Sequence, residues 1–157
     1  ITLDNITGYA MRGLDSLNSK EFDVISLDLD GNDYYFVEKL LKNSILPKLF
    51  IVEYNGKFIP PIKFKIEFNA NHIWSGNEDY FGCSLSTYNE LFSSYGYNLI
   101  CCNSWSGINA FFVKKEYFHL FPEIPKNISS IYIPPFYHKR KIGHPVSSIK
   151  TIKHVIK

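Results

Sequence analysis

The stretch Phe22-Asp-Val-Ile-Ser-Leu-Asp-Leu-Asp-Gly-Asn-Asp33 decides how the rest of the chain is interpreted. Residues 22–29 predict a β-strand, and the last four residues of the stretch form a polar turn rich in helix-capping types. Residues 34–42 then place apolar side chains at helical spacing. Residues 49–54 are almost wholly apolar, as expected of a strand buried on both faces. A strand, a helix and a strand in this order predict a parallel pair with a right-handed crossover, and therefore an α/β fold.

The chain beyond residue 83 predicts one more helix and a pair of strands. Ser84 is expected to cap a helix that runs to Tyr95, and Gly96 is a natural helix terminator. Residues 97–102 and 109–113 predict two strands joined by a short turn. Because the connection is so short, we expect the two strands to form an antiparallel hairpin.

The N-terminal residues carry weaker signals. Residues 2–18 predict a helical region with Thr2 or Asp4 as its N-cap, broken by Gly8 and Gly13. Neither glycine follows a predicted strand, so neither forms the glycine-rich loop that binds a nucleotide in doubly wound folds. The first five residues also lack the basic and apolar runs of a signal peptide.

Composition limits the class of protein. A length of 157 residues, 45% hydrophobic and 20% charged, is that of one globular domain. No apolar run approaches the roughly 18 residues of a membrane span. Three cysteines, two of them adjacent at Cys101 and Cys102, form neither a disulfide framework nor a zinc motif. The sequence therefore predicts a reduced, cytoplasmic protein.

The C-terminal residues differ in charge from the rest of the chain. No acidic residue follows Glu123, whereas lysine and arginine recur to the end. We expect residues 1–118 to form the domain and residues 119–157 a basic, proline-containing tail with a short helix near residues 146–155. Such a tail can bind nucleic acid or an anionic surface. A solvated tail is the more common case, so the sequence does not favour nucleic acid as a partner.

Four polar side chains end the two predicted parallel strands. Asp28 and Asp30 alternate onto one face at the end of the first strand, and Glu53 and Asn55 do the same at the end of the second. Ligands of open α/β sheets bind at this edge. Asp28, Asp30 and Glu53 predict a site for Mg²⁺, with Asp30 and Glu53 also candidates for a catalytic base and Asn55 for a substrate contact. The alternative is that Asp30 caps the next helix and Asp28 bonds the backbone of the turn.

The long segment over residues 55–82 is expected to cover this edge. A connection of that length in a compact domain is usually functional. His72 is a candidate base or substrate contact, and Trp74, Asp79 and Tyr80 are candidate substrate-binding residues. A single loop histidine is more often a bystander, so this alternative stays open.

Four short stretches together resemble the FkbM-like class I methyltransferases. Residues 22–34 are similar to the fourth strand and turn of that family, which often read D-(I/V)-(D/E)-G, and residues 49–55 are similar to its fifth strand. Residues 79–85 resemble the segment that opens the next helix, and residues 107–113 the last strand. The resemblance covers residues 2–118 in order.

This resemblance implies a partial Rossmann-like sheet whose last strand is antiparallel. It implies methyl transfer from S-adenosylmethionine to a hydroxyl of a sugar, natural product or lipid-like acceptor. Asp28, Asp30, Glu53 and Asn55 match positions where some metal-assisted O-methyltransferases hold a metal or substrate. The glycine-rich first half, which would bind most of the cofactor, is missing from this sequence. We therefore expect a fragment that is inactive alone and pairs with an N-terminal half or a second copy.

Two alternatives remain at this stage. One is a non-catalytic, methyltransferase-like binding module that uses its basic tail. The other is a metal-dependent glycosyltransferase, because Asp28-Leu29-Asp30 satisfies the Asp-x-Asp pattern that holds a metal–nucleotide. The order of the predicted elements fits that second class less well.

Overall fold

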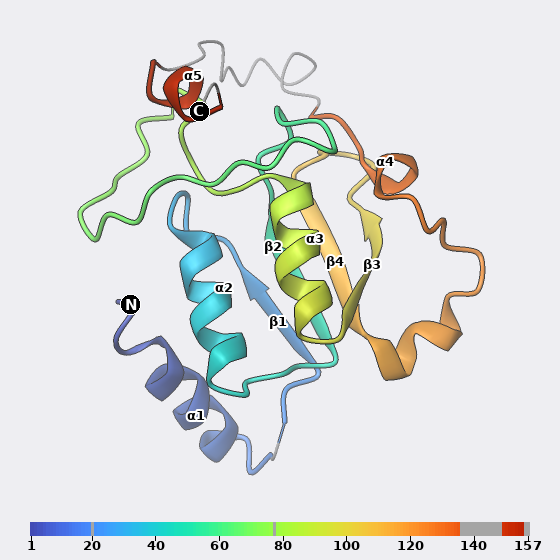
Figure 1. Ribbon diagram of the computed structural model, residues 1–157. Coiled ribbons are helices and arrows are strands. Elements are labelled where there is room, and N and C mark those ends of the chain that lie inside the picture. The colour runs from blue at the N-terminus through green and yellow to red at the C-terminus, as the bar shows by residue number, and fades with distance from the viewer. Residues whose placement is uncertain (20, 77, 136–148, 156–157) are drawn as a thin grey trace.

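The strands of the described residues form one open sheet in the order β1-β2-β4-β3 (Figure 1). The computed structural model describes residues 1–19, 21–76, 78–135 and 149–155. The strands are β1 (Val24–Leu27), β2 (Leu49–Glu53), β3 (Tyr97–Cys102) and β4 (Asn109–Lys114). β1 and β2 are parallel, and β4 is antiparallel to both β2 and β3. The last strand of the sheet therefore lies between the second and the third, and the predicted parallel pair and hairpin are confirmed.

Burial distinguishes the central strands from the edge strand. Phe50 and Val52 of β2 and Phe112 of β4 are fully buried. Val24 at the start of β1 remains 48% exposed, because β1 has a neighbour on one side only. β2 therefore has the near-continuous apolar sequence of a strand inside a sheet, whereas β1 is shorter than predicted and forms an edge.

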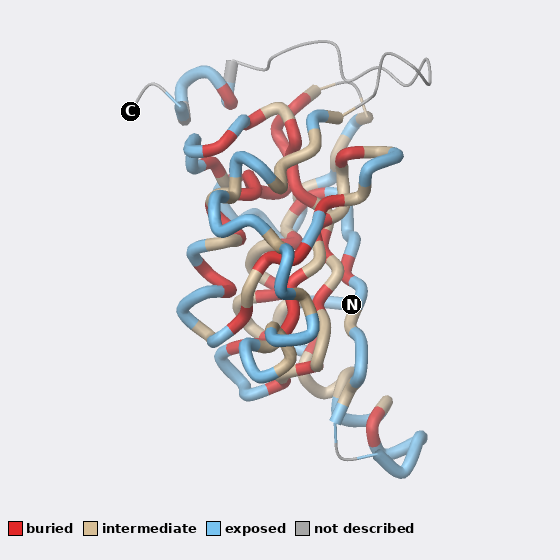
Figure 2. The backbone as a smooth tube through the Cα atoms, turned by 90° about the vertical axis from the view of Figure 1, so that its right-hand side faces the viewer, coloured by how far each residue is buried: buried red, intermediate tan, exposed pale blue. Residues whose placement is uncertain are grey.

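Two helices, α2 (Asp33–Lys42) and α3 (Leu85–Ser94), cover one face of the sheet (Figure 1). Their apolar side chains close a core of stacked rings, in which Phe92 of α3 lies 4.2 Å from Phe112 of β4 between ring centroids. Ser84 caps α3 by accepting a hydrogen bond from the backbone N–H of Thr87, as predicted. Figure 2 shows the buried residues running through the middle of the molecule, with exposed backbone around them.

The first helix, α1 (Ile6–Ser16), contacts α2 and lies beside the β1 edge. Its N-cap is Asn5, whose side chain instead accepts a hydrogen bond from the backbone N–H of Thr2, so the prediction of Thr2 or Asp4 as N-cap is wrong. Gly8 and Gly13 lie inside α1 and do not break it, since a helix tolerates an isolated glycine at about 1 kcal/mol.

The segment after β4 packs back onto the sheet. A 3₁₀ helix, η1 (Lys115–Leu120), contacts β3 and β4, and the short α4 (Ile128–Ile131) contacts β3. The hydroxyl of Tyr54, at the end of β2, donates a 2.6 Å hydrogen bond to the carbonyl of Ile133. The predicted C-terminal helix is present as α5 (Ile149–Val155). The rest of the predicted tail, residues 136–148 and 156–157, lies outside the described residues.

Candidate functional site

The turn after β1 is held by the carboxylate of Asp33, the first residue of α2. Its two oxygens accept hydrogen bonds from the backbone N–H groups of Leu29 at 2.7 Å and Gly31 at 2.8 Å. Burial raises the pKa of Asp33, and these backbone hydrogen bonds act in the opposite direction. Between the two anchored amides, Asp30 adopts a left-handed backbone conformation with φ of 53°, which aspartate tolerates better than most residues. The turn thus has a fixed shape.

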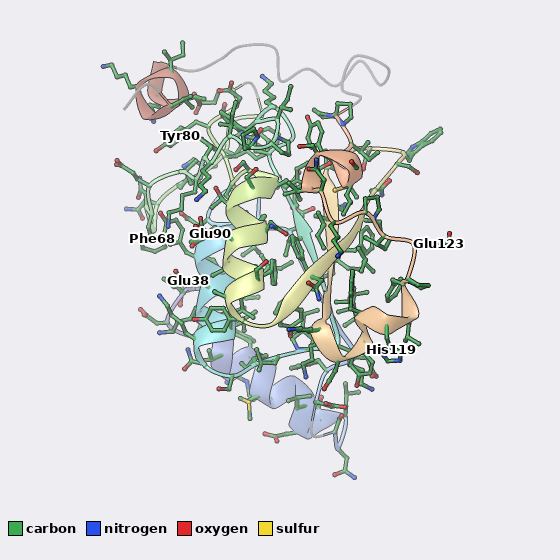
Figure 3. All side chains as sticks on the ribbon, turned by 45° about the vertical axis from the view of Figure 1, so that its right-hand side comes forward. Glu38, Phe68, Tyr80, Glu90, His119 and Glu123 are labelled. Atoms are coloured by element: carbon green, nitrogen blue, oxygen red, sulfur yellow. The ribbon has the colours of Figure 1, made fainter. Side chains whose placement is uncertain are left out.

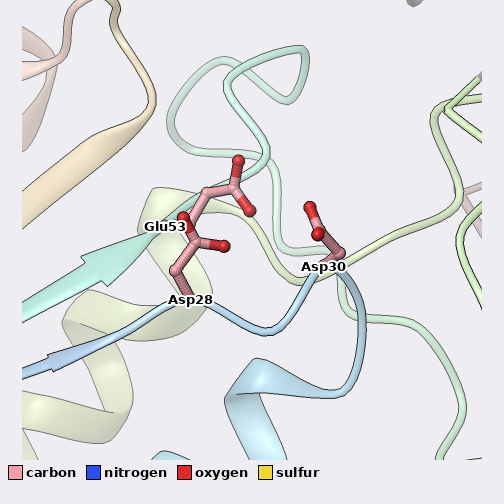
Figure 4. A group of neighbouring side chains, drawn as sticks. All are labelled: Asp28, Asp30 and Glu53. Atoms are coloured by element: carbon pink, nitrogen blue, oxygen red, sulfur yellow. The ribbon is translucent and has the colours of Figure 1, made fainter.

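Three carboxylates converge beside this turn (Figure 4). Asp28 and Asp30 come from the end of β1 and Glu53 from the end of β2, and one oxygen of each lies within 4.8 Å of the other two. The parallel register pairs Leu27 with Val52, so the next residues along, Asp28 and Glu53, leave adjacent strands at the same height. The structure therefore brings together all three predicted metal ligands.

The two strand ends differ in their surroundings. Asp28 and Asp30 are exposed, whereas Glu53 is partly buried. Burial, followed by repulsion from Asp28, Asp33 and Asp30 and a hydrogen bond with Asp28, raises the pKa of Glu53 to about 8. Glu53 therefore holds a proton more readily than an ordinary glutamate, because its carboxyl is partly buried and lies beside other carboxylates.

The alternative roles for the two aspartates do not match the structure. The N-cap of α2 is Asn32, whose side chain makes no capping hydrogen bond, so Asp30 does not cap the helix. The described hydrogen bonds to the backbone of the turn come from Asp33 rather than Asp28. Asp28 and Asp30 are thus left facing Glu53.

Asn55 lies near the strand ends but serves the long segment that follows. Its side chain is fully buried, and Nδ2 donates to the carbonyls of Asp79 at 2.8 Å and Phe81 at 3.2 Å. Its Oδ1 accepts from the backbone N–H of Lys57 at 3.3 Å. The structure therefore places Asn55 as an anchor of the loop rather than as the predicted substrate contact.

Asp79 and Trp74 also bond to the chain itself. The buried Asp79 carboxylate accepts a 2.7 Å hydrogen bond from the Thr151 hydroxyl of α5 and lies 3.7 Å from the Lys57 ammonium. Trp74 donates from Nε1 to the carbonyl of Glu78 at 2.8 Å, and its ring centroid lies 4.9 Å from that of Phe81. In place of the predicted substrate contacts, the structure gives these two residues roles in fixing the loop and the C-terminal helix.

His72 and Tyr80 line a pocket next to the carboxylates. The His72 ring packs so closely on Gly31 that a Cβ added there would lie 2.5 Å from His72 Cδ2. Tyr80 is buried, and its hydroxyl accepts a hydrogen bond from the backbone N–H of Glu67 at 3.1 Å. The pocket has a volume of about 480 Å³ and is completed by Glu67, Phe68, Asn69, Lys150 and Lys153. His72 and Tyr80 thus belong to the wall of a pocket.

Sequence reasoning missed three residues of this region: Asp33, Lys150 and Lys153. An aspartate in the first turn of a helix that follows a strand was a usable signal for Asp33. The spacing of three residues between the lysines was a signal that they share a helix face. The sequence contains no signal, however, that indicates where α5 packs on the rest of the chain.

Comparison with known proteins gives no relatives. No protein-family model matches the chain, and no match was found among curated proteins or solved structures. Within the part of the chain that the structure describes, no helix has the length and apolar character needed to cross a membrane.

Proposed function

We propose that this chain is the acceptor-side half of a class I S-adenosylmethionine-dependent methyltransferase domain that methylates a hydroxyl group. The observation that carries the proposal is the convergence of Asp28, Asp30 and Glu53 at the ends of two adjacent parallel strands. In open α/β sheets this edge is where ligands bind. The acceptor hydroxyl would therefore lie beside these carboxylates.

The sheet supports the proposal. β1, β2 and β3 run in one direction because β4 is antiparallel to both of its neighbours. A sheet whose last strand alone is antiparallel is what the resemblance to FkbM-like methyltransferases implies.

The donor set suits a divalent cation such as Mg²⁺. Three carboxylates with oxygens within 4.8 Å of one another supply the hard, charged ligands that Mg²⁺ prefers, and the exposed side of the cluster leaves room for its water molecules. A cation bound there would stabilise the negative charge that develops on the acceptor oxygen. The carboxylates themselves would orient the hydroxyl and accept its proton.

The described residues do not form a site for S-adenosylmethionine itself. The glycines before β1 lie inside α1 rather than in a loop after a strand. On the proposal, the cofactor-binding strands belong beside β1, whose outer edge borders a pocket of about 350 Å³ lined mainly by apolar side chains.

The cation site is tested by Mn²⁺ titration, because Mn²⁺ accepts the same ligands and is observed directly by electron paramagnetic resonance. We expect one saturable site, weakened at least tenfold in the D28N/E53Q variant. The matched control is D15N/E123Q, which removes two exposed carboxylates outside the cluster. Equal loss in both variants, or no saturable site, overturns the proposal of a metal. In a protein that also contains the glycine-rich half, unchanged methyl transfer after Glu53→Ala would remove Glu53 from the mechanism.

A further inference from the structure

We propose that the pocket beside His72 binds an anionic group, a phosphate or a carboxylate, of the molecule on which the site acts. This pocket, called the basic pocket below, is lined by Glu67, Phe68, Asn69, His72, Tyr80, Lys150 and Lys153. The residues of the pocket themselves support the binding of an anion. The further claim that this anion is part of the acceptor rests on the proposed function.

The basic pocket is assembled from two parts of the chain that are distant in sequence. Residues 67–80 of the long loop form its base, and α5 supplies the two lysines. Figure 3 places Tyr80 close beneath α5, with Phe68 on the same side of the molecule. Lys150 and Lys153 are three residues apart, so they lie on the same face of the helix.

Buried contacts hold the two parts together. Thr151 of α5 is only 4% exposed, and its hydroxyl donates to the carboxylate of Asp79. The ammonium of Lys150 lies 5.6 Å from the centroid of the Tyr80 ring, a cation–π distance. The Tyr80 ring in turn lies 6.3 Å from that of His72. The pocket is therefore a packed structure and not a chance grouping of surface side chains.

The charges of the pocket favour an anion. Lys150 and Lys153 carry two positive charges, and among the described residues neither forms an ion pair, whereas Glu67 supplies the one negative charge of the lining. The charged residues of the lining thus leave one positive charge in excess. The two ammonium groups are donors suited to phosphate or carboxylate oxygens.

His72 connects the pocket with the carboxylate cluster. Its Nε2 is buried and has no hydrogen-bond partner among the described residues. This edge of the ring faces Gly31, the residue after Asp30, so it fixes the ring on the turn and leaves the rest of the side chain to line the pocket. A molecule bound in the basic pocket would therefore lie near the turn that carries Asp30.

The experiment is an NMR titration of the whole 157-residue chain with inorganic phosphate and, separately, with acetate, at constant ionic strength set by chloride. We expect saturable shifts at His72 and Tyr80 with one of the two anions. Saturation by phosphate points to a phosphorylated acceptor, and saturation by acetate to a carboxylate-bearing one. Linear, unsaturated shifts with both anions overturn the proposal.

Two variants make the titration specific. K150Q/K153Q removes the two pocket charges, and we expect it to weaken the anion at least tenfold. K115Q/K126Q removes two exposed charges elsewhere and should leave the affinity within twofold. Equal weakening in both variants means non-specific attraction and overturns the proposal. H72Q is a third test. If the His72 side chain contacts the anion, this variant should weaken anion binding although both lysine charges are intact.

The outcome is separable from that of the metal test. Mn²⁺ binding depends on Asp28 and Glu53, whereas anion binding depends on Lys150 and Lys153. Absence of the Mn²⁺ site with anion binding intact would overturn the metal part of the proposed function and leave the basic pocket as an anion site independent of a metal.

Discussion

The carboxylate cluster and the basic pocket share one turn, through Asp30 in the cluster and through the packing of His72 on Gly31, but contacts of different sequence range build them. The cluster comes from two adjacent strand ends and a turn that Asp33 closes from within four residues. The pocket depends on a contact between Thr151 and Asp79, which are 72 residues apart. Closing a short turn costs little conformational entropy, whereas a contact between residues far apart in sequence must offset a larger entropy cost of loop closure. The cluster should thus be the more rigid of the two regions, and the pocket the more easily lost.

The substitution with the largest expected effect on the free energy of unfolding is Asp33→Ala, which acts on the turn beside the carboxylate cluster. It removes the acceptor for the backbone N–H groups of Leu29 and Gly31, one of them in a buried hydrogen bond. Losing hydrogen bonds to a charged acceptor and leaving a buried donor unpaired should cost about 2 to 4 kcal/mol. Urea unfolding measures this cost, with the exposed Asp15→Ala as control.

The same variant tests whether the turn shapes the cluster. Without Asp33, Asp28 and Asp30 lose the fixed backbone that directs them toward Glu53, so the Mn²⁺ site should weaken even under conditions where the protein is fully folded. A variant that is destabilised but binds Mn²⁺ normally would mean that the strand ends alone position the carboxylates.

Sequence reasoning succeeded where the geometry of neighbouring strands fixes the position of a side chain. The Asp28, Asp30 and Glu53 cluster could be predicted because alternation along a strand and the parallel pairing of neighbours fix where those side chains go. The antiparallel hairpin was predictable for the same reason. The insertion of β4 between β2 and β3 was not predicted, because nothing local in residues 109–114 states which strand they pair with.

Sequence reasoning was less successful for polar side chains that could bond either to a substrate or to the chain itself. Asn55 and Asp79 were predicted to contact substrate because they are polar residues near the expected site. The structure instead pairs them with the loop and with α5. A buried polar group must find a partner, and the chain itself supplied one. A sequence gives the residue type but not whether its hydrogen-bonding capacity is already used.

An intermediate effect is expected from Gly31→Ala, which acts between the two regions. The new Cβ would clash with the His72 ring, so the ring must move, at a cost of about 1 to 3 kcal/mol typical of overpacking. Anion binding should fall while Mn²⁺ binding persists, as measured in the same two titrations. The double variant G31A/H72A should recover stability, because the clashing ring is gone. Equal loss of both ligands would mean that the two regions are not separable at Gly31.

The last expected effect concerns pH and belongs to the cluster alone. The pKa of Glu53 is about 8 in the folded chain against an ordinary 4.5. The folded state therefore holds a proton that the unfolded state has released, so this residue makes stability fall as pH rises from about 4.5 to 8. Glu53→Gln removes the titrating group, so its free energy of unfolding relative to the parent should rise by at least about 1 kcal/mol between pH 5 and pH 8.5.

The comparison of parent and variant isolates Glu53, because every other titrating group is common to both. Adding Mg²⁺ at pH 8.5 should then narrow the gap, as a cation that binds only the folded cluster stabilises it by mass action and does so mainly when Glu53 is ionised. Unfolding curves that run parallel for parent and E53Q from pH 5 to 8.5 would mean that Glu53 is ionised in the folded chain throughout. In that case neither burial nor the neighbouring carboxylates would raise the pKa of Glu53, and the pH dependence expected of the cluster would be wrong.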